Sequence, residues 1–243
     1  MSEQIYYKVL GPEGLCCHGG VGQWKLDGSW MLPVYGRLAP CVRGYHLCRA
    51  EDLVEWIGPV IWTAEGRGLS FLSPQYHIFQ EARVIQCLDR WTPAMARGFA
   101  VVCAERVLPM IAAVLPGDRR VTDALELARE WIGDAGRQDA AQSMAAEIWR
   151  IARLFDDAAR DALLAIYGTV CWQSGGMAAW AAAASVRSAV AAAAREGSLV
   201  ASKAQGVHPR DAERQADGAA NEAWKSERAW QTDLLFSLIG DEA

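Results

Sequence analysis

Residues 91–115 read WTPAMARGFAVVCAERVLPMIAAVL, and this stretch decides the fold. It opens with a helix start signal, because the Thr92 side chain can cap the first turn and Pro93 suits the first helical position. Beyond its first two turns the stretch carries only two charged side chains, Glu105 and Arg106. A helix that is apolar nearly all round is normally covered on several sides. The stretch therefore predicts one central helix that begins a helical domain and ends a different domain before it.

Downstream of this stretch the sequence is helical in pattern. Apolar residues recur at helical spacing in residues 122–132, 138–155, 157–172, 175–194 and 209–239, with a break at 197–209. Alanine-rich faces let helices approach closely. We predict an Ala-rich all-α bundle of about six helices over residues 90–243.

The first 89 residues predict a small mixed α+β domain. Strand-like composition occurs at 5–10, 34–38, 44–48, 59–64 and 82–88, and a short helix is expected at 50–57. Asp27-Gly28 is a hairpin signal between short strands that contain Trp24 and Trp30. Residues 66–74 are rich in glycine and serine and predict a loop or lid. The whole chain is thus expected to be α+β, with domains at 1–89 and 90–243.

Composition narrows the function classes. The chain has 243 residues, 52% of them hydrophobic, and a formal net charge of −5, which argues against nucleic acid as the main partner. The cysteine count is odd, at seven, and no signal peptide is recognisable at the start, so we expect free thiols and a cytoplasmic location. The two most apolar stretches contain Glu105–Arg106 and Arg187, which favours core helices over membrane spans.

Thiols and an imidazole cluster in the N-terminal part. Cys16, Cys41, His46 and Cys48 are of the types that bind zinc. Their spacing lacks a Cys-x-x-Cys pair, and the other interpretation is small core thiols with one hydrogen-bonded histidine. The glycines near residue 20 lack the Gly-Lys-Ser/Thr of a phosphate loop. We therefore predict no metal and no cofactor.

A second constellation consists of charges. Glu105 and Arg106 lie in the most apolar helix and need partners. An antiparallel helix pair would bring them to charges in the next helix and its approach, namely Arg119, Arg120, Asp123, Glu126 and Arg129. This set predicts either an ion-pair network that fixes helix register or a polar spot that binds a partner.

The C-terminal part carries a family resemblance. Residues 103–109 (CAERVLP), 118–120 (DRR) and 124–131 (ALELAREW) resemble a helical domain family of bacterial immunity proteins. The resemblance covers about residues 90–155, and residues 178–194 lack the histidine expected there. It implies a binding role and no known chemistry.

The N-terminal part carries a different resemblance. Residues 44–48 (GYHLC), followed by 51–53 (EDL), resemble a small domain seen in phage and actinobacterial proteins. More distantly, a strand followed by a helix resembles the core of ADP-ribosyltransferase-like folds. That likeness implies catalytic candidates at Tyr7, Tyr45, His46 and Glu81.

The sequence supports two hypotheses. The first is a non-enzymatic cytoplasmic protein that binds another protein, such as a toxin or a defence component in phage–host conflict (an immunity or anti-defence role). The exposed side of its last helix could also pair in a homodimer. The alternative is an ADP-ribosyltransferase-like or nucleotide-binding enzyme with its site in the N-terminal domain.

Overall fold

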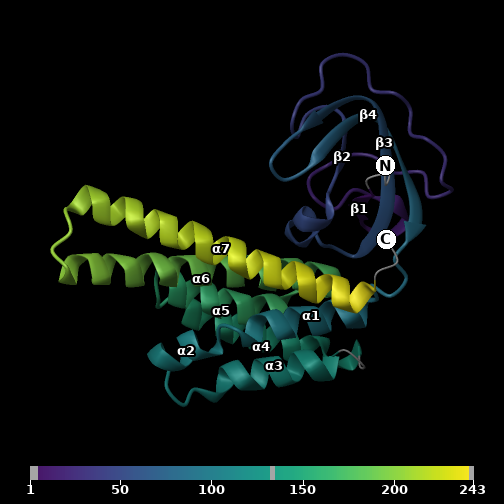
Figure 1. The fold of residues 1–243 in the computed structure, drawn as a ribbon. Helices are drawn as coiled ribbons and strands as arrows, with labels where there is room; N and C mark the ends of the chain where they lie inside the picture. The colour runs from purple at the N-terminus through teal and green to yellow at the C-terminus, as the bar shows by residue number, and fades with distance from the viewer. Residues whose placement is uncertain (1–4, 132–134, 241–243) are drawn as a thin grey trace.

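The computed structural model describes residues 5–131 and 135–240 and confirms an α+β fold. A curled four-stranded sheet forms the N-terminal part, and a helical bundle forms the rest (Figure 1). The antiparallel strands are β1 (Tyr6–Leu10), β2 (Tyr45–Leu47), β3 (Val60–Leu72) and β4 (His77–Cys87), in the order β1-β3-β4-β2. Two short 3₁₀ helices, η1 (Pro12–Gly14) and η2 (Ala50–Glu55), lie between the strands.

The sheet curls until its two edges meet. Tyr7 and Cys48 exchange two backbone hydrogen bonds of 2.8 Å, which join β1 to the residue that follows β2. Side chains alternate between the faces of a strand. Tyr6 and Leu10 therefore share an inner cluster with Leu47, whereas Tyr7 packs on the opposite side, in the core that the sheet shares with the helices.

Between β1 and β2 the predicted strands do not form. The hairpin at Asp27-Gly28 and the strand at 34–38 are wrong, because Asp27 Oδ1 accepts hydrogen bonds from the backbone and hydroxyl of Ser29 and forms a local turn. The chain then pairs with β4 instead of with itself, since Met31 and Val34 donate their backbone N–H groups to Ala82 and Gln80.

The expected lid at 66–74 is also wrong, because β3 continues to Leu72 and pairs with β4 as a hairpin. The glycines that suggested a loop have other uses. Gly66 leaves room for the Phe79 ring, which a Cβ would strike, and Gly68 has a φ of 78° where the pairing shifts register between Arg67 and Ser70.

The bundle contains seven described α-helices. They are α1 (Pro93–Glu105), α2 (Leu108–Val114), α3 (Arg119–Trp131), α4 (Gln138–Ala152), α5 (Asp157–Cys171), α6 (Gly175–Ala204) and α7 (Pro209–Ile239). The long helices α6 and α7 form a hairpin whose joined ends extend beyond the other helices (Figure 1). The break expected at 197–209 is confined to the residues just before Pro209, because the exposed Gly197 is tolerated within α6.

The stretch at 91–115 forms two helices where one was predicted. Thr92 caps α1 as expected, with its Oγ1 accepting the Met95 N–H at 3.1 Å. The helix ends at Glu105 because Pro109 has no N–H to donate to the Glu105 carbonyl and its ring would clash there. The most central helix is α6, which packs against α1, α5, α7 and η2.

By length and composition α6 is also apolar enough to cross a membrane. Its Arg187 is buried, and its first turn lies against the residues between η2 and β3, with Gly176 beside the Gly58 carbonyl. These contacts on several sides are those of a core helix.

Alanine at Gly176 should lower the free energy of unfolding by about 1–3 kcal/mol, because its Cβ would press on the backbone of Gly58 and Pro59. The matched control is Gly197→Ala, where a Cβ would meet nothing within 4 Å and stability should rise by about 0.5–1 kcal/mol. Urea unfolding of both variants measures the difference. Equal effects would contradict the close docking of α6 on Gly58 and Pro59.

Candidate functional site

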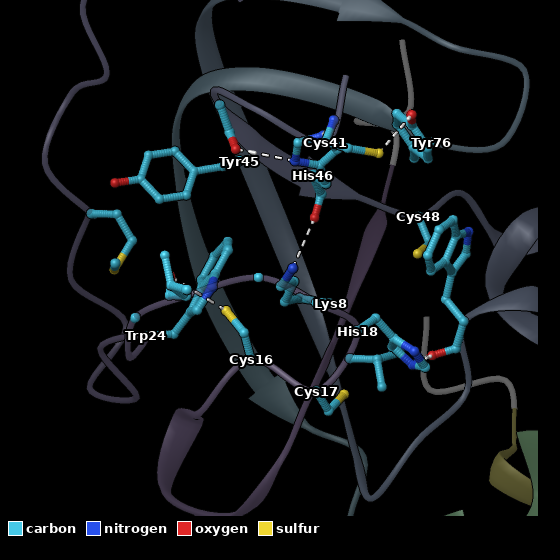
Figure 2. Close-up of a pocket in the computed structure, with 18 of the residues that line it drawn as sticks. Lys8, Cys16, Cys17, His18, Trp24, Cys41, Tyr45, His46, Cys48 and Tyr76 are labelled. Atoms are coloured by element: carbon cyan, nitrogen blue, oxygen red, sulfur yellow. Dashed lines mark hydrogen bonds between the residues drawn. The ribbon is translucent and has the colours of Figure 1, made fainter. Parts of the chain in front are cut away.

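A cavity of about 540 Å³ opens between β1, β2 and the glycine-rich segment 16–24. Figure 2 shows its polar groups, which come from segments far apart in the sequence. Its lining includes Lys8, Cys16, Cys17, His18, Trp24, Cys41, Tyr45, His46, Cys48, Trp56 and Tyr76, but no aspartate or glutamate. Its volume lies within the range of small-molecule sites, roughly 300–1,000 Å³.

Lys8 is the only cationic residue in this lining. On β1 it shares the inward face with Tyr6 and Leu10. Its Nζ donates to the His46 carbonyl at 3.2 Å and lies 4.9 Å from the centroid of the Trp24 ring. No carboxylate in the described part of the chain pairs with it. Burial lowers the pKa of Lys8 below its ordinary value.

Three thiols surround the ammonium group, as Figure 2 shows for Cys16, Cys17 and Cys48. Burial raises the pKa of Cys48 to about 12 and also raises the pKa of Cys17. A thiol is nucleophilic as the thiolate. These two groups are therefore protonated near neutral pH and do not form a nucleophile pair with the nearby imidazoles.

The zinc candidates do not assemble. His46 Nε2 accepts the Cys41 N–H at 3.0 Å, and Nδ1 lies 3.1 Å from the Gly44 carbonyl, to which it must donate. Both ring nitrogens thus serve the turn before β2, and Cys41 is exposed with its Sγ 3.8 Å from the Tyr76 hydroxyl. Over residues 5–131 and 135–240, no group of three His, Cys, Asp or Glu side chains could hold a metal ion.

His18 joins the cavity to the helices. Its Nε2 donates to the Trp56 carbonyl at 2.7 Å, and its ring lies against the rings of Trp56 and Trp180. Burial lowers the pKa of His18, which favours the neutral ring. Its role in this geometry is to position the segment that carries Cys17.

The candidates implied by the transferase likeness are spread over different surfaces. Tyr45 and His46 line the cavity, and the Tyr45 hydroxyl donates to the Leu32 carbonyl at 2.8 Å. Tyr7 is 2% exposed and packs on Phe236 of α7. Glu81 forms an ion pair with Arg67 on the outer hairpin, at 2.7 Å. Neither Tyr7 nor Glu81 belongs to the cavity lining.

The predicted charge network forms only in part. Glu105 pairs with Arg129, as an antiparallel helix pair requires, but this pair is exposed. The remaining candidates form local surface contacts or none: Arg119 with Asp123, Arg120 with Asp118, and an exposed Glu126. Arg106 does not join them, because it reaches Glu227 on α7 at 2.8 Å and stacks on Trp230.

The buried polar network lies elsewhere and was missed. Glu227, 2% exposed, accepts from Arg106 and from Gln231, and Gln231 in turn accepts from Arg187 at 2.5 Å. Nearby, Arg228 of α7 pairs with Asp52 and Glu55 of η2. Long sequence separations hide these contacts, although a charged side chain amid alanines, such as Arg187, is a usable signal.

Lys8 was also missed, and strand alternation is the signal that could have found it. A strand reading Tyr-Tyr-Lys-Val-Leu places Lys8 on the same face as Tyr6 and Leu10, both buried. A cation on a face that is otherwise apolar marks a group that needs a counter-charge.

Comparisons with known proteins found no matching family model, no matching curated protein and no matching solved structure. The two family resemblances therefore stay predictions.

Replacing Arg228 with methionine should lower the free energy of unfolding by about 3–5 kcal/mol, because the buried Asp52 would keep only Arg49 and Glu55 would lose its pair with Arg228. The control Arg195→Met removes an exposed pair with Glu213 and should leave the unfolding midpoint almost unchanged. Chemical denaturation compares the two, and a loss of similar size in both would contradict this assignment.

Replacing Lys8 with methionine should make the stability difference from wild type depend on pH. The folded pKa of Lys8 is lowered, so the ammonium disfavours folding at neutral pH. That cost is relieved as pH rises through the folded pKa toward 10.5, and the wild type should gain on the variant across this window. Unfolding midpoints measured between pH 7 and pH 10 test the sign, with Lys25→Met as the control. A constant difference would contradict the assignment.

Proposed function

We propose that this protein acts by binding another protein, with the N-terminal part as its recognition end. The observation that carries the proposal is a set of exposed apolar side chains in the segment between η1 and β2. Val21 is 98% exposed, Val42 82%, Tyr35 78% and Leu32 75%. Large exposed apolar groups that gather in one region mark interaction sites on soluble proteins.

Three of these residues form what we call the apolar segment: Leu32, Tyr35 and Val42. This segment has little regular structure, and it is held against β4 and β2 through the backbone of residues 31 and 34 and the Tyr45 hydroxyl. Anchored loops with exposed aromatic and aliphatic side chains are suited to recognition, because little order has to be gained on binding.

The charge of this surface specifies the partner further. From residue 28 to residue 50 the chain has no acidic residue. Arg37 and Arg43 are exposed there, and neither pairs with a carboxylate in the described part of the chain. A partner with an apolar centre and an acidic rim would complement it.

The bundle fits this proposal as a support. Asp52 and Glu55 fix η2 to α7, so the sheet that carries the apolar segment is held on a rigid base. The resemblance of residues 90–155 to immunity proteins suggests a toxin or defence component as the class of partner, with cytoplasmic encounter as the setting. The enzymatic alternative has no comparable support, since Tyr7 and Glu81 lie away from the cavity.

The triple variant Leu32→Ser, Tyr35→Ser, Val42→Ser should lose at least tenfold of the partner that the tagged wild type recovers from cells of the native host. The matched control places serine at Val114, Leu154 and Val200, which are exposed on the bundle. Quantitative mass spectrometry of the captured proteins measures the ratio. A protein recovered equally with both triple variants, or no recovered protein, would contradict the proposal.

A further inference from the structure

We propose that the cavity around Lys8 binds a small anionic molecule that carries an aromatic ring, with the anionic group on the Lys8 ammonium. This site adjoins the protein contact proposed above, because Val42 belongs to both the apolar segment and the cavity lining, whereas Lys8 points inward and lies outside the apolar segment. The anion would be a carboxylate or a phosphate monoester, which share the property of accepting from an ammonium group.

The first argument is the missing counter-charge. An ammonium group has three donors, and within residues 5–131 and 135–240 one of them has a hydrogen-bond partner, the His46 carbonyl. The cavity lining contains no aspartate or glutamate, so none of the polar groups around the ammonium supplies a carboxylate counter-charge. A cation so placed is costly unless something compensates it, and a bound anion would do so.

A purely structural role explains the position of Lys8 less well than a bound anion does. An inward-pointing lysine can prevent an exposed edge strand from pairing with another sheet. Here β1 is not exposed on that side at Tyr7, because its backbone already bonds to Cys48. The edge is therefore closed one residue from Lys8, without help from its charge.

The second argument is the ring surface on the cavity walls. Trp24 and Tyr45 meet edge to face with centroids 5.3 Å apart, and Trp56 and Tyr76 meet in the same way at 5.8 Å. All four residues line the cavity. Rings prefer offset or edge contacts with other rings, so these walls suit a flat aromatic ligand.

The third argument comes from the glycine-rich segment. The backbone N–H groups of residues 17–22 make no hydrogen bond with another residue of the described chain. Gly19 and Gly22 have φ values of 76° and 106°, and a Cβ at either would meet nothing within 4 Å. Free N–H groups on a turn of this kind are an anion-binding element, and here they border the cavity that holds Lys8.

Isothermal titration calorimetry with three matched probes tests the site: phenyl phosphate, benzoate and neutral benzamide. At least one of the two anions should bind the wild-type protein saturably, at least tenfold more tightly than benzamide, and more weakly as salt is added. The anion that binds identifies the ligand as a phosphate ester or a carboxylate. Lys8→Met should lower the affinity for that anion at least tenfold, whereas Lys25→Met should not change it.

A labelling experiment on the wild type keeps the test independent of variant folding. Pyridoxal phosphate is itself an aromatic phosphate. Its aldehyde condenses with an amine, releasing water and forming an imine. Borohydride then reduces this imine to a stable amine. The chain has four lysines, Lys8, Lys25, Lys203 and Lys225. Lys8 should be labelled first, and the anion that binds should protect it.

The proposal is overturned if neither anion binds, if benzamide binds as tightly as the anions, or if Lys8→Met retains wild-type affinity. Equal labelling of all four lysines, without protection, would overturn it too. The protein-binding proposal fails separately, through the serine variants of the apolar segment, so the two outcomes can be told apart.

Discussion

The contact of Arg228 with Asp52 and Glu55 is the constraint on which the arrangement of the two parts depends. Asp52 is fully buried, so its charge is tolerable only while the guanidinium of α7 and that of Arg49 hold it. Coulomb attraction between the two charges is strong at low dielectric, and the hydrogen bonds between them fix their relative orientation. Apolar contacts such as Tyr7 on Phe236 could slide, but this ion pair sets the position of η2 along α7.

Lys8 differs in its hydrogen-bond partners from the buried arginines of the bundle. Arg97 donates to three carbonyls at the end of α5, and Arg187 donates to Gln231. The bonds of Arg97 hold the end of α5, and the bond of Arg187 joins α6 to Gln231 of α7. Lys8 has one carbonyl and one ring, which leaves two donors without a partner in the described chain. A cation in a cavity whose lining contains no carboxylate is a candidate to hold an anion.

The sequence predicted those elements whose formation depends on interactions between neighbouring residues. The cap at Thr92, the helix from Pro209 to Ile239 and the strand before Cys48 each depend on neighbouring residues. Pro109 was present in the sequence as a break signal, but the apolar run around it outweighed it. The segment after Gly28 has the composition of short strands, but it stays irregular, and its Leu32 and Tyr35 are exposed.

Only the part of the candidate site that is local in sequence could be predicted. The thiols and His46 are close in sequence, so they were found, but their roles depend on a turn geometry that spacing does not reveal. Arg106 and Glu227 are 121 residues apart, and no pattern of single residues identifies such a pair. A cavity is a property of how β1, β2 and the glycine-rich segment close on one another.

The placement of the two proposed surfaces follows from the curl of the sheet. Closure by Tyr7 and Cys48 turns one face of β1 inward, where Lys8 and the rings enclose the cavity, and leaves the chain between η1 and β2 outside as a wrapping segment. That segment supplies Trp24 and Met31 to the cavity wall and Leu32 and Tyr35 to the solvent. A ligand on Lys8 would therefore stiffen the same backbone that presents the apolar segment.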